Sequence, residues 1–270
     1  MSLSSLRSHR LGLSAAAVLL ALGLNAGCGS DDAGDPNPLP SGNLCDTPVV
    51  SPCMDQAITQ AGLKGTVAKG LITNASEGNG VWASEIDATA GGLTPTESYV
   101  YAAFGDAGLV KLNLDDESAF NDMVWDVAFR RFVIRINSGD SGPSCDVAAV
   151  LGSNVRFDSV TLVPTSLTYY SDDFMSDPPA CTMNTDASGM NSPAVFMGGF
   201  WHHVNNAYGG CLQMTDQVYI LQVRSGRHVR FTVTHYYNAT PQEACDTDPA
   251  SFNAMGQGSG HVGVRWAFLD

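Results

Sequence analysis

Hydrophobic and polar positions alternate along much of this chain, with the period of two that is typical of a β-strand with one buried face. The segment from Leu109 to Leu114 alternates well. A β-rich run at 98–104 precedes it, and the turn-forming residues 105–108 lie between them, which predicts a hairpin. In 131–136, Phe132, Ile134 and Ile136 share one face. Arg135 lies on the opposite, less apolar face, so it requires solvent or a carboxylate partner.

The same reasoning predicts further strands in both halves of the chain. These strands are expected at 124–129, 155–163, 217–223, 228–237 and 263–268. Residues 137–143 and 224–226 are rich in Gly, Ser, Asp or Pro and are predicted to be turns. Helical spacing is fair only from Met54 to Leu63, and residues 171–194 form a long irregular stretch of the kind that is usually functional or disordered. The predicted fold class is therefore all-β, a mainly antiparallel sheet or sandwich with long loops.

The N-terminus has the pattern of a secretory signal. Arg7 and Arg10 precede an apolar run from Leu11 to Leu24 that is too short to span a bilayer comfortably, and small residues lead to Cys28. This pattern predicts a signal peptide over 1–27 and a lipoprotein acylated on Cys28, although Asn25 occupies the position where the usual pattern has Leu. The alternative is an ordinary secreted protein with a chance cysteine. Residues 28–44 then form a polar, flexible tether, and 45–270 form a single domain.

The charge balance limits the possible partners. Removal of residues 1–27 removes two arginines and no acidic residue, which leaves 11 Lys+Arg against 27 Asp+Glu and changes the net charge from −14 to −16. Such a chain repels phosphate backbones, so no nucleic-acid partner is expected. Contact with a membrane would come from the lipid anchor. The expected location is the outer membrane, on the cell surface or the periplasmic face, because Gly rather than Asp follows Cys28.

Six cysteines follow Cys28, and an even number in an exported chain favours disulfide bonds. They are Cys45, Cys53, Cys145, Cys181, Cys211 and Cys245, which allow 15 pairings. Cys45 and Cys53 are close enough to close a local loop. A bond between Cys181 and Cys211 is a second hypothesis, because these residues flank the two candidate ligand loops described below.

Motifs of common enzyme classes are absent from the sequence, including the GxSxG, HExxH, P-loop and GxGxxG patterns. Gly139-Asp140-Ser141-Gly142 is similar to a serine-protease nucleophile motif, but no His/Asp set precedes it at convincing positions, so it is interpreted as a turn. The protein is therefore not expected to be an enzyme.

Three segments occur in order along the chain. The first is Trp125 to Arg131 leading to 137–142, the second is Gly198-Gly199-Phe200, and the third is Arg224-Ser225-Gly226 followed by 229–231 and Tyr236-Tyr237. Over about residues 97–268 the chain thus resembles the HmuY family, lipid-anchored haem-binding β proteins of Bacteroidetes with relatives in other Gram-negative bacteria. The resemblance implies an antiparallel β domain whose loops hold haem between two axial His or Met side chains. It also implies capture of haem, free or from a haem-carrying protein, for iron acquisition without enzymatic chemistry.

The resemblance places the ligands in two loops. The second family ligand falls on Asn205, a poor iron ligand, and His203 or its neighbour His202 is the expected replacement. The first ligand loop, 171–184, contains Met175 and Met183 instead of histidine, and Met197 is close to the histidine pair. A Met/His or Met/Met haem site follows as the hypothesis.

Other interpretations remain open. His228 and His235 point to opposite faces of one strand, and His261 lies in a glycine-rich loop, so none of them is expected to bind the iron. The acidic runs 115–122 and 172–177 lack EF-hand spacing, and calcium is not expected there. Asn205 and the disulfide bonds would also suit an HmuY-like scaffold that binds no haem and serves in adhesion or in protein or glycan interaction.

Overall fold

The computed structural model describes residues 43–269 apart from 93, 153, 187 and 189. The chain divides into two units, Met1–Pro38 and Leu39–Asp270, and all described residues belong to the second. The predicted signal peptide, Cys28 and most of the tether therefore lie outside the described residues.

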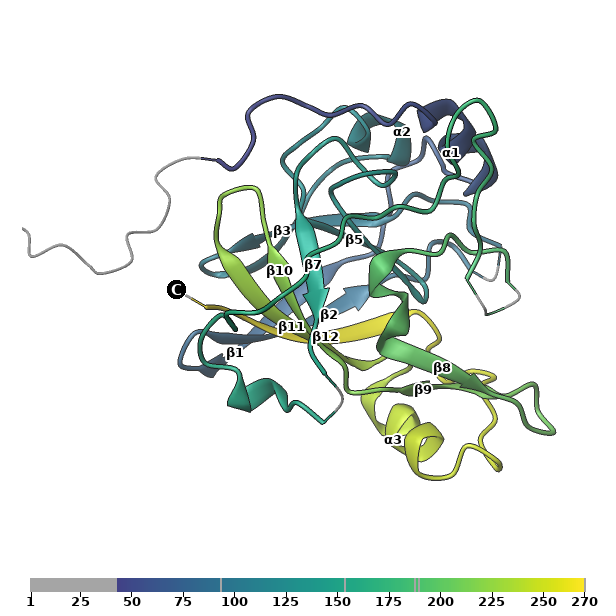
Figure 1. Ribbon diagram of the computed structural model, residues 1–270. Helices are drawn as coiled ribbons and strands as arrows, with labels where there is room; N and C mark the ends of the chain where they lie inside the picture. The colour runs from purple at the N-terminus through teal and green to yellow at the C-terminus, as the bar shows by residue number, and fades with distance from the viewer. Residues whose placement is uncertain (1–42, 93, 153, 187, 189, 270) are drawn as a thin grey trace, which may run out of the picture. The chain divides into compact units, whose positions relative to one another are not determined.

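The larger sheet is antiparallel and has six strands. Their spatial order is β1 (Ile72–Gly78), β2 (Val81–Asp87), β12 (His261–Phe268), β11 (His228–His235), β10 (Val218–Gln222) and β7 (Val147–Val150). The C-terminal strand β12 thus lies between strands from both halves of the chain (Figure 1). Val229, Phe231 and Val233 of β11 are buried on alternate positions, as the sequence pattern predicted.

A second antiparallel sheet has four strands in the order β4 (Gly108–Lys111), β3 (Val100–Gly105), β5 (Val127–Arg130) and β6 (Val133–Ile136). The predicted hairpin is confirmed as β3 and β4. The turn between β5 and β6 contains only Arg131 and Phe132, and Arg131 has a positive φ of 53°. All residues of β5 and β6 are buried, which places these two strands in the interior of the unit, whereas β4 at the other edge is partly exposed.

Short elements complete the unit. They are α1 (Met54–Gln60), α2 (Asp116–Ala119), α3 (Ala239–Thr247), the 3-10 helices η1 (Phe157–Ser159) and η2 (Phe196–Phe200), and the two-stranded ribbon β8 (Trp201–Val204) and β9 (Cys211–Met214). Figure 1 shows this ribbon beside α3, and Gln213 of β9 donates a hydrogen bond to the Asp246 carbonyl at 2.8 Å. Among the described residues, no helix has both the length and the apolar character needed to cross a bilayer.

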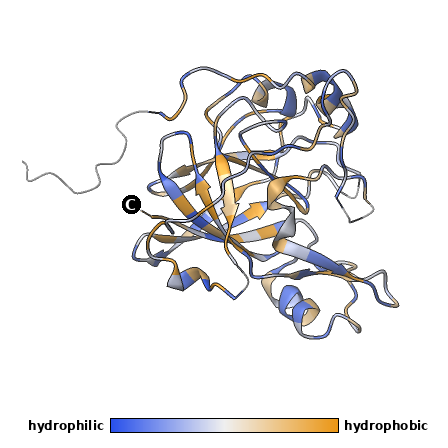
Figure 2. Cartoon of the chain, in the orientation of Figure 1, coloured by the Kyte–Doolittle hydropathy of each residue, from blue (hydrophilic) through white to orange (hydrophobic). Residues whose placement is uncertain are grey.

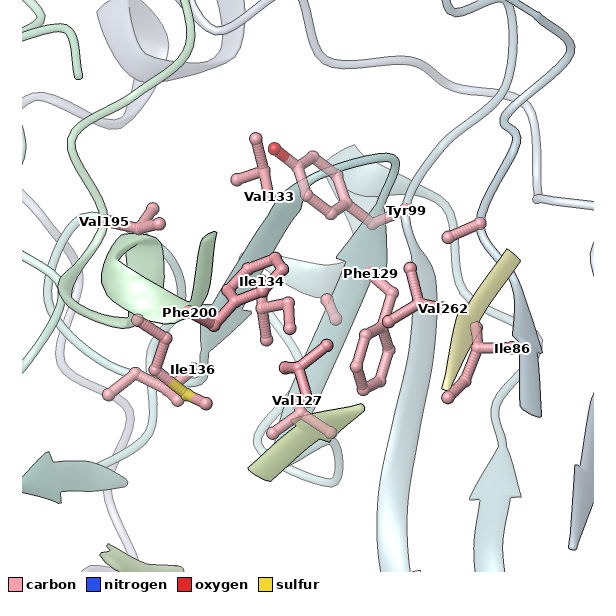
Figure 3. Packing of buried hydrophobic residues seen from close by; sticks show 14 of the residues in the cluster. Ile86, Tyr99, Val127, Phe129, Val133, Ile134, Ile136, Val195, Phe200 and Val262 are labelled. Atoms are coloured by element: carbon pink, nitrogen blue, oxygen red, sulfur yellow. The ribbon is translucent and has the colours of Figure 1, made fainter. Parts of the chain in front are cut away.

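The main core lies between the two sheets. Phe129, Val127 and Ile134 of the four-stranded sheet extend into the same cluster as Ile86 and Val262 of the six-stranded sheet (Figure 3). The apolar residues are concentrated in the central strands, which border this core (Figure 2). Phe104 of β3 meets Trp266 of β12 with ring centroids 4.9 Å apart, so aromatic contacts join the sheets.

Two local predictions were wrong. Residues 155–163 do not form a strand but contain η1, because Phe157 and Val160 are three residues apart and are buried together in a small separate cluster. His261 does not lie in a loop. It is the first residue of β12 and is paired with Asp87 of β2.

The structure pairs all six cysteines, which confirms a disulfide framework. The bonds are Cys45–Cys145, Cys53–Cys181 and Cys211–Cys245. The local Cys45–Cys53 loop and the Cys181–Cys211 bond were therefore wrong predictions. The reason is spatial: α1 packs beside the long loop at Cys181, where Gln60 donates to the Cys181 carbonyl at 2.7 Å, whereas α3 contacts β9.

Candidate functional site

A cavity of about 380 Å³ joins β8 to the long irregular loop. The residues that line it are Asp186, Ser188, Gly198, Trp201, His202, His203 and Asn205. The structure thus places both candidate histidines beside the 171–194 stretch, but no residue of the predicted ligand loop 171–184 lines the cavity. The loop contributes Asp186 and Ser188, which the sequence analysis missed. Their Asp-x-Ser spacing could have indicated a turn at this point of the sequence. In the structure the Asp186 carboxylate accepts a hydrogen bond from Ser188 N at 3.0 Å and fixes that turn.

His203 is held by its own hairpin. Its Nε2 lies 3.2 Å from the Gly209 carbonyl oxygen, a contact in which the ring donates its Nε2–H and leaves Nδ1 free. A Cβ at Gly210, which has a φ of 92°, would lie 2.6 Å from this Nε2, so the hairpin needs glycine there to accommodate the ring. His202 is exposed and, as the adjacent strand residue, points to the opposite face of the ribbon.

Two contacts fix the position of the ribbon. The Trp201 indole donates a hydrogen bond from Nε1 to the Phe132 carbonyl at 3.1 Å, and the two rings pack edge to face with centroids 5.2 Å apart. On the other strand, the Cys211–Cys245 bond and a hydrogen bond from Met214 N to Asp246 Oδ1 at 2.9 Å tie β9 to α3. The imidazoles therefore extend from a braced element.

The methionines occupy different places. Met197 is fully buried in η2, Met175 is 6% exposed within the main core, and Met183 packs against the edge of that core. Met175 and Met183 face each other in an antiparallel bridge. None of the three lines the cavity beside His203, so sulfur ligation of a metal in that cavity would require the loop to rearrange.

The remaining histidines are used within the larger sheet. His235 is buried, and its Nε2 lies 2.8 Å from Glu85 Oε2. His261 is half-buried at the start of β12. Within the described part of the chain, no group of three or more His, Cys, Asp or Glu side chains is arranged to hold a metal ion.

The acidic runs have structural partners. Asp115 caps α2 by accepting a hydrogen bond from Ser118 N at 2.7 Å. Asp116 is completely buried and accepts hydrogen bonds from Lys64 N, Tyr99 N and the Tyr101 hydroxyl. The carboxylates of Asp115 and Asp116 thus accept hydrogen bonds that stabilise the local fold.

A buried polar network anchors the long loop. Asp172, fully buried at the start of that loop, accepts hydrogen bonds from Ile136 N at 3.1 Å, from the Ser141 hydroxyl at 2.5 Å and from Phe196 N at 2.9 Å. Arg135 donates to Ser141 Oγ at 3.0 Å. Asp172 therefore links β6, the 137–143 turn and the start of η2, which leads directly into β8.

The electrostatics of this network follow from its burial. Burial raises the pKa of Asp172 above its ordinary value, while the hydrogen bonds from Ser141, Phe196 N and Ile136 N and the charge of Arg135 act in the opposite direction. From the sequence we expected Arg135 to need solvent or a carboxylate partner. In the structure Arg135 donates to the Ser141 hydroxyl, which in turn donates to the Asp172 carboxylate. Ser141 is itself fully buried, which agrees with its interpretation as a turn residue.

Comparison with known proteins identifies the family. The model of the HmuY protein family matches residues 95–248, which is more than half of the chain, and the chain therefore belongs to the HmuY family. No curated protein matches the sequence.

Several solved structures are similar to this chain at low sequence identity. A protein of Bacteroides vulgatus assigned as HmuY-like and haem-binding is 15% identical, with a TM-score of 0.44, and the match covers 73% of this chain and 96% of the other. A protein of Bacteroides fragilis assigned as a lipoprotein is 13% identical, with a TM-score of 0.43 and coverage of 72% and 92%. The apo HmuY analogue of Tannerella forsythia is 17% identical, with a TM-score of 0.39 and coverage of 74% and 97%.

Proposed function

We propose that this chain binds haem without enzymatic chemistry and that the cavity between β8 and the long loop receives it. The observation that supports the proposal most strongly is the presence of two imidazoles and an indole on one cavity, in a chain of the HmuY family. Haem iron accepts an imidazole nitrogen, and an indole offers an apolar face to the porphyrin.

His203 is the better candidate ligand of the pair. A ligating histidine usually donates its second ring N–H to a carbonyl or carboxylate, which fixes the ring and raises the basicity of the ligating nitrogen. The Nε2 contact of His203 with the Gly209 carbonyl is such an arrangement and leaves Nδ1 for the iron. His202, exposed on the opposite face, is the alternative donor. Met175 and Met183 stay in the proposal as donors for the other side of the iron once the loop moves.

A haemin titration tests this proposal. We expect the chain to give a Soret band with a single-site isotherm, and His203→Ala to weaken binding at least tenfold and to shift the band. His202→Ala is expected to have a smaller effect. His261→Ala removes an imidazole from the six-stranded sheet, outside the cavity, and is expected to have no effect. Met183→Leu tests sulfur ligation through the near-infrared charge-transfer band of ferric haem.

The opposite outcome is equally clear. If haemin at micromolar concentration produced no spectral change in the wild-type chain, the haem proposal would be wrong. A glycan or protein-interaction role of the same scaffold would then be the remaining alternative, since Asn205, a poor iron ligand, occupies the position that the resemblance assigns to the second ligand.

We also propose that the mature chain is a lipoprotein anchored through Cys28 in the outer membrane. The support is the signal-like segment before Cys28 and the polar residues that follow it. Metabolic labelling with radioactive palmitate is expected to label the wild-type chain and to leave Cys28→Ser unlabelled. Equal labelling of both chains would contradict the assignment of the acylated residue.

A further inference from the structure

A second cavity, of about 340 Å³, is lined by Phe132, whose ring packs against Trp201 of the first cavity. Its charged lining residues are all positive, and they are Lys64, Arg130 and Arg131. The chain as a whole carries an excess of 14 acidic charges. The positive charge at this cavity is therefore opposite in sign to the net charge of the chain.

Two of these cations have no anionic partner. Arg130 is paired with the buried Asp116 at 3.6 Å and donates to the carbonyls of Ala61 and Gly62, so its charge is largely used within the fold. Arg131 donates one hydrogen bond, to the Gly92 carbonyl at 3.2 Å. Within the described residues, no ion pair neutralises Arg131 or Lys64. The cavity thus presents about two uncompensated positive charges.

The backbone at Arg131 is also unusual. Arg131 is the first of two residues in the β5–β6 turn and has a φ of 53°, a conformation for which such turns favour glycine or asparagine. A hydrogen bond from Arg131 N to the Ala88 carbonyl at 2.7 Å holds this conformation. A side chain that occupies a strained turn position and faces a cavity is a signature of a functional position.

Much of the remaining wall is apolar, and its polar residues are Gln60, Thr94, Asn191 and Ser192. Phe132, Val133, Pro95, Met190 and Pro193 complete the cavity between the β5–β6 turn and the 190–193 part of the long loop. In Figure 1 this loop lies on the same side of the unit as α1, whose C-terminal residue Gln60 also lines the cavity. The combination of an apolar wall and unpaired cations fits a ligand that has an apolar body and a negative charge.

We propose that this cavity is a binding site for a small organic carboxylate with an apolar body, held by Arg131 and Lys64. The site is distinct from the cavity beside His203, and the two share no lining residue. The guanidinium of Arg131 is suited to pair with a carboxylate through two N–H groups, and Lys64 adds a point charge. Phe132 and Met190 contact the apolar body.

The test uses 2-naphthoate and its neutral isostere 2-naphthamide as probes of the full chain, in equilibrium dialysis against buffer alone. We expect 2-naphthoate to bind, with an affinity that falls as NaCl is raised, and 2-naphthamide to bind at least tenfold more weakly. Arg131→Gln and Lys64→Gln are each expected to lower the affinity for 2-naphthoate about three- to tenfold. The matched control, Lys69→Gln, removes an exposed cation that already pairs with Glu97 and is expected to change nothing.

Arg131→Gly separates binding from folding. It removes the charge and relieves the positive φ, so its thermal midpoint should equal or exceed that of the wild type while its affinity for 2-naphthoate falls. His203→Ala should bind 2-naphthoate normally, which separates this site from the haem proposal. Equal affinity for the charged and neutral probes, or wild-type affinity in Arg131→Gln, would overturn the inference.

Discussion

Replacement of Asp172 by alanine is expected to lower the free energy of unfolding by about 3–5 kcal/mol, the usual cost of removing one partner from a buried charged network. The substitution removes one of the two carboxylates whose charge acts on the buried Arg135, the other being Asp116, and removes the acceptor of two backbone N–H groups, Ile136 N and Phe196 N. Neither N–H has another hydrogen-bond partner among the residues that the structure describes. Each orphaned donor adds to the loss.

The measurement is urea unfolding with the disulfides intact. Asp173→Ala is the matched control, because the neighbouring Asp173 is exposed and its loss should change stability by less than about 0.5 kcal/mol. Should Asp172→Ala fail to fold, Asp172→Asn keeps an acceptor oxygen and should give a smaller, measurable loss. A change below about 1 kcal/mol in Asp172→Ala would show that the network does not anchor the loop.

This network also connects stability to the candidate site. Phe196, whose N–H donates a hydrogen bond to Asp172, is the first residue of η2. This helix leads directly into β8, which carries His202 and His203. We therefore expect Asp172→Asn to weaken haemin binding as well, although Asp172 lies outside the cavity. Asp173→Ala again serves as the control.

Strands with one buried face could be predicted because burial itself creates the alternating pattern. Strand β11 follows this rule, whereas β6 and β10 are buried on both faces and were predicted from their β-branched and aromatic residues. By contrast, β1 is an edge strand whose residues after Ile72 are all exposed, so it leaves no hydrophobic period in the sequence. Its partner β2 was missed with it, since β2 is recognisable mainly through that pairing.

The candidate site was predictable only in part, because the sequence can locate residues on segments but not the spacing between segments. The double glycine located His202 and His203 on one element, and the resemblance linked that element to the long loop. Which loop residues reach the histidines depends on how the loop closes, and the structure selects Asp186 and Ser188. The cysteine pairing depends on the same long-range geometry, as the Cys53–Cys181 bond over 128 residues shows.

The second large expected effect is a loss of stability as the pH rises through neutrality. Burial raises the pKa of Asp126 to about 7, while a hydrogen bond from Phe104 N at 2.7 Å and the charge of Arg224 oppose the shift. Burial and the charge of Asp126 raise the pKa of Asp146 well above its ordinary value. Both carboxyl oxygens of Asp146 are buried, and polar contacts with Arg224 N and Ser144 and the charge of Arg224 oppose the shift.

The sign follows from proton binding. Between the unfolded pKa of about 4 and the folded pKa near 7, the folded protein holds protons that the unfolded chain has lost. The stability contributed by these protons is fully present below pH 4 and is lost as the pH rises to 7. One such proton changes the free energy of unfolding by about 1.4 kcal/mol per pH unit within this window.

Urea unfolding at pH 5, 6, 7 and 8 measures this slope. Asp126→Asn retains an acceptor for Phe104 N but cannot ionise, so it should flatten the slope and exceed the wild-type stability by a margin that grows from pH 5 to pH 7. Asp55→Asn, which changes an exposed carboxylate in α1, should keep the wild-type slope. Since Leu44 N donates to the Arg224 carbonyl at 2.6 Å and Cys45 is bonded to Cys145 beside Asp146, ionisation of the pair acts where the N-terminal segment joins the domain. Identical slopes in the wild type and Asp126→Asn would show that this carboxyl does not titrate between pH 5 and 8.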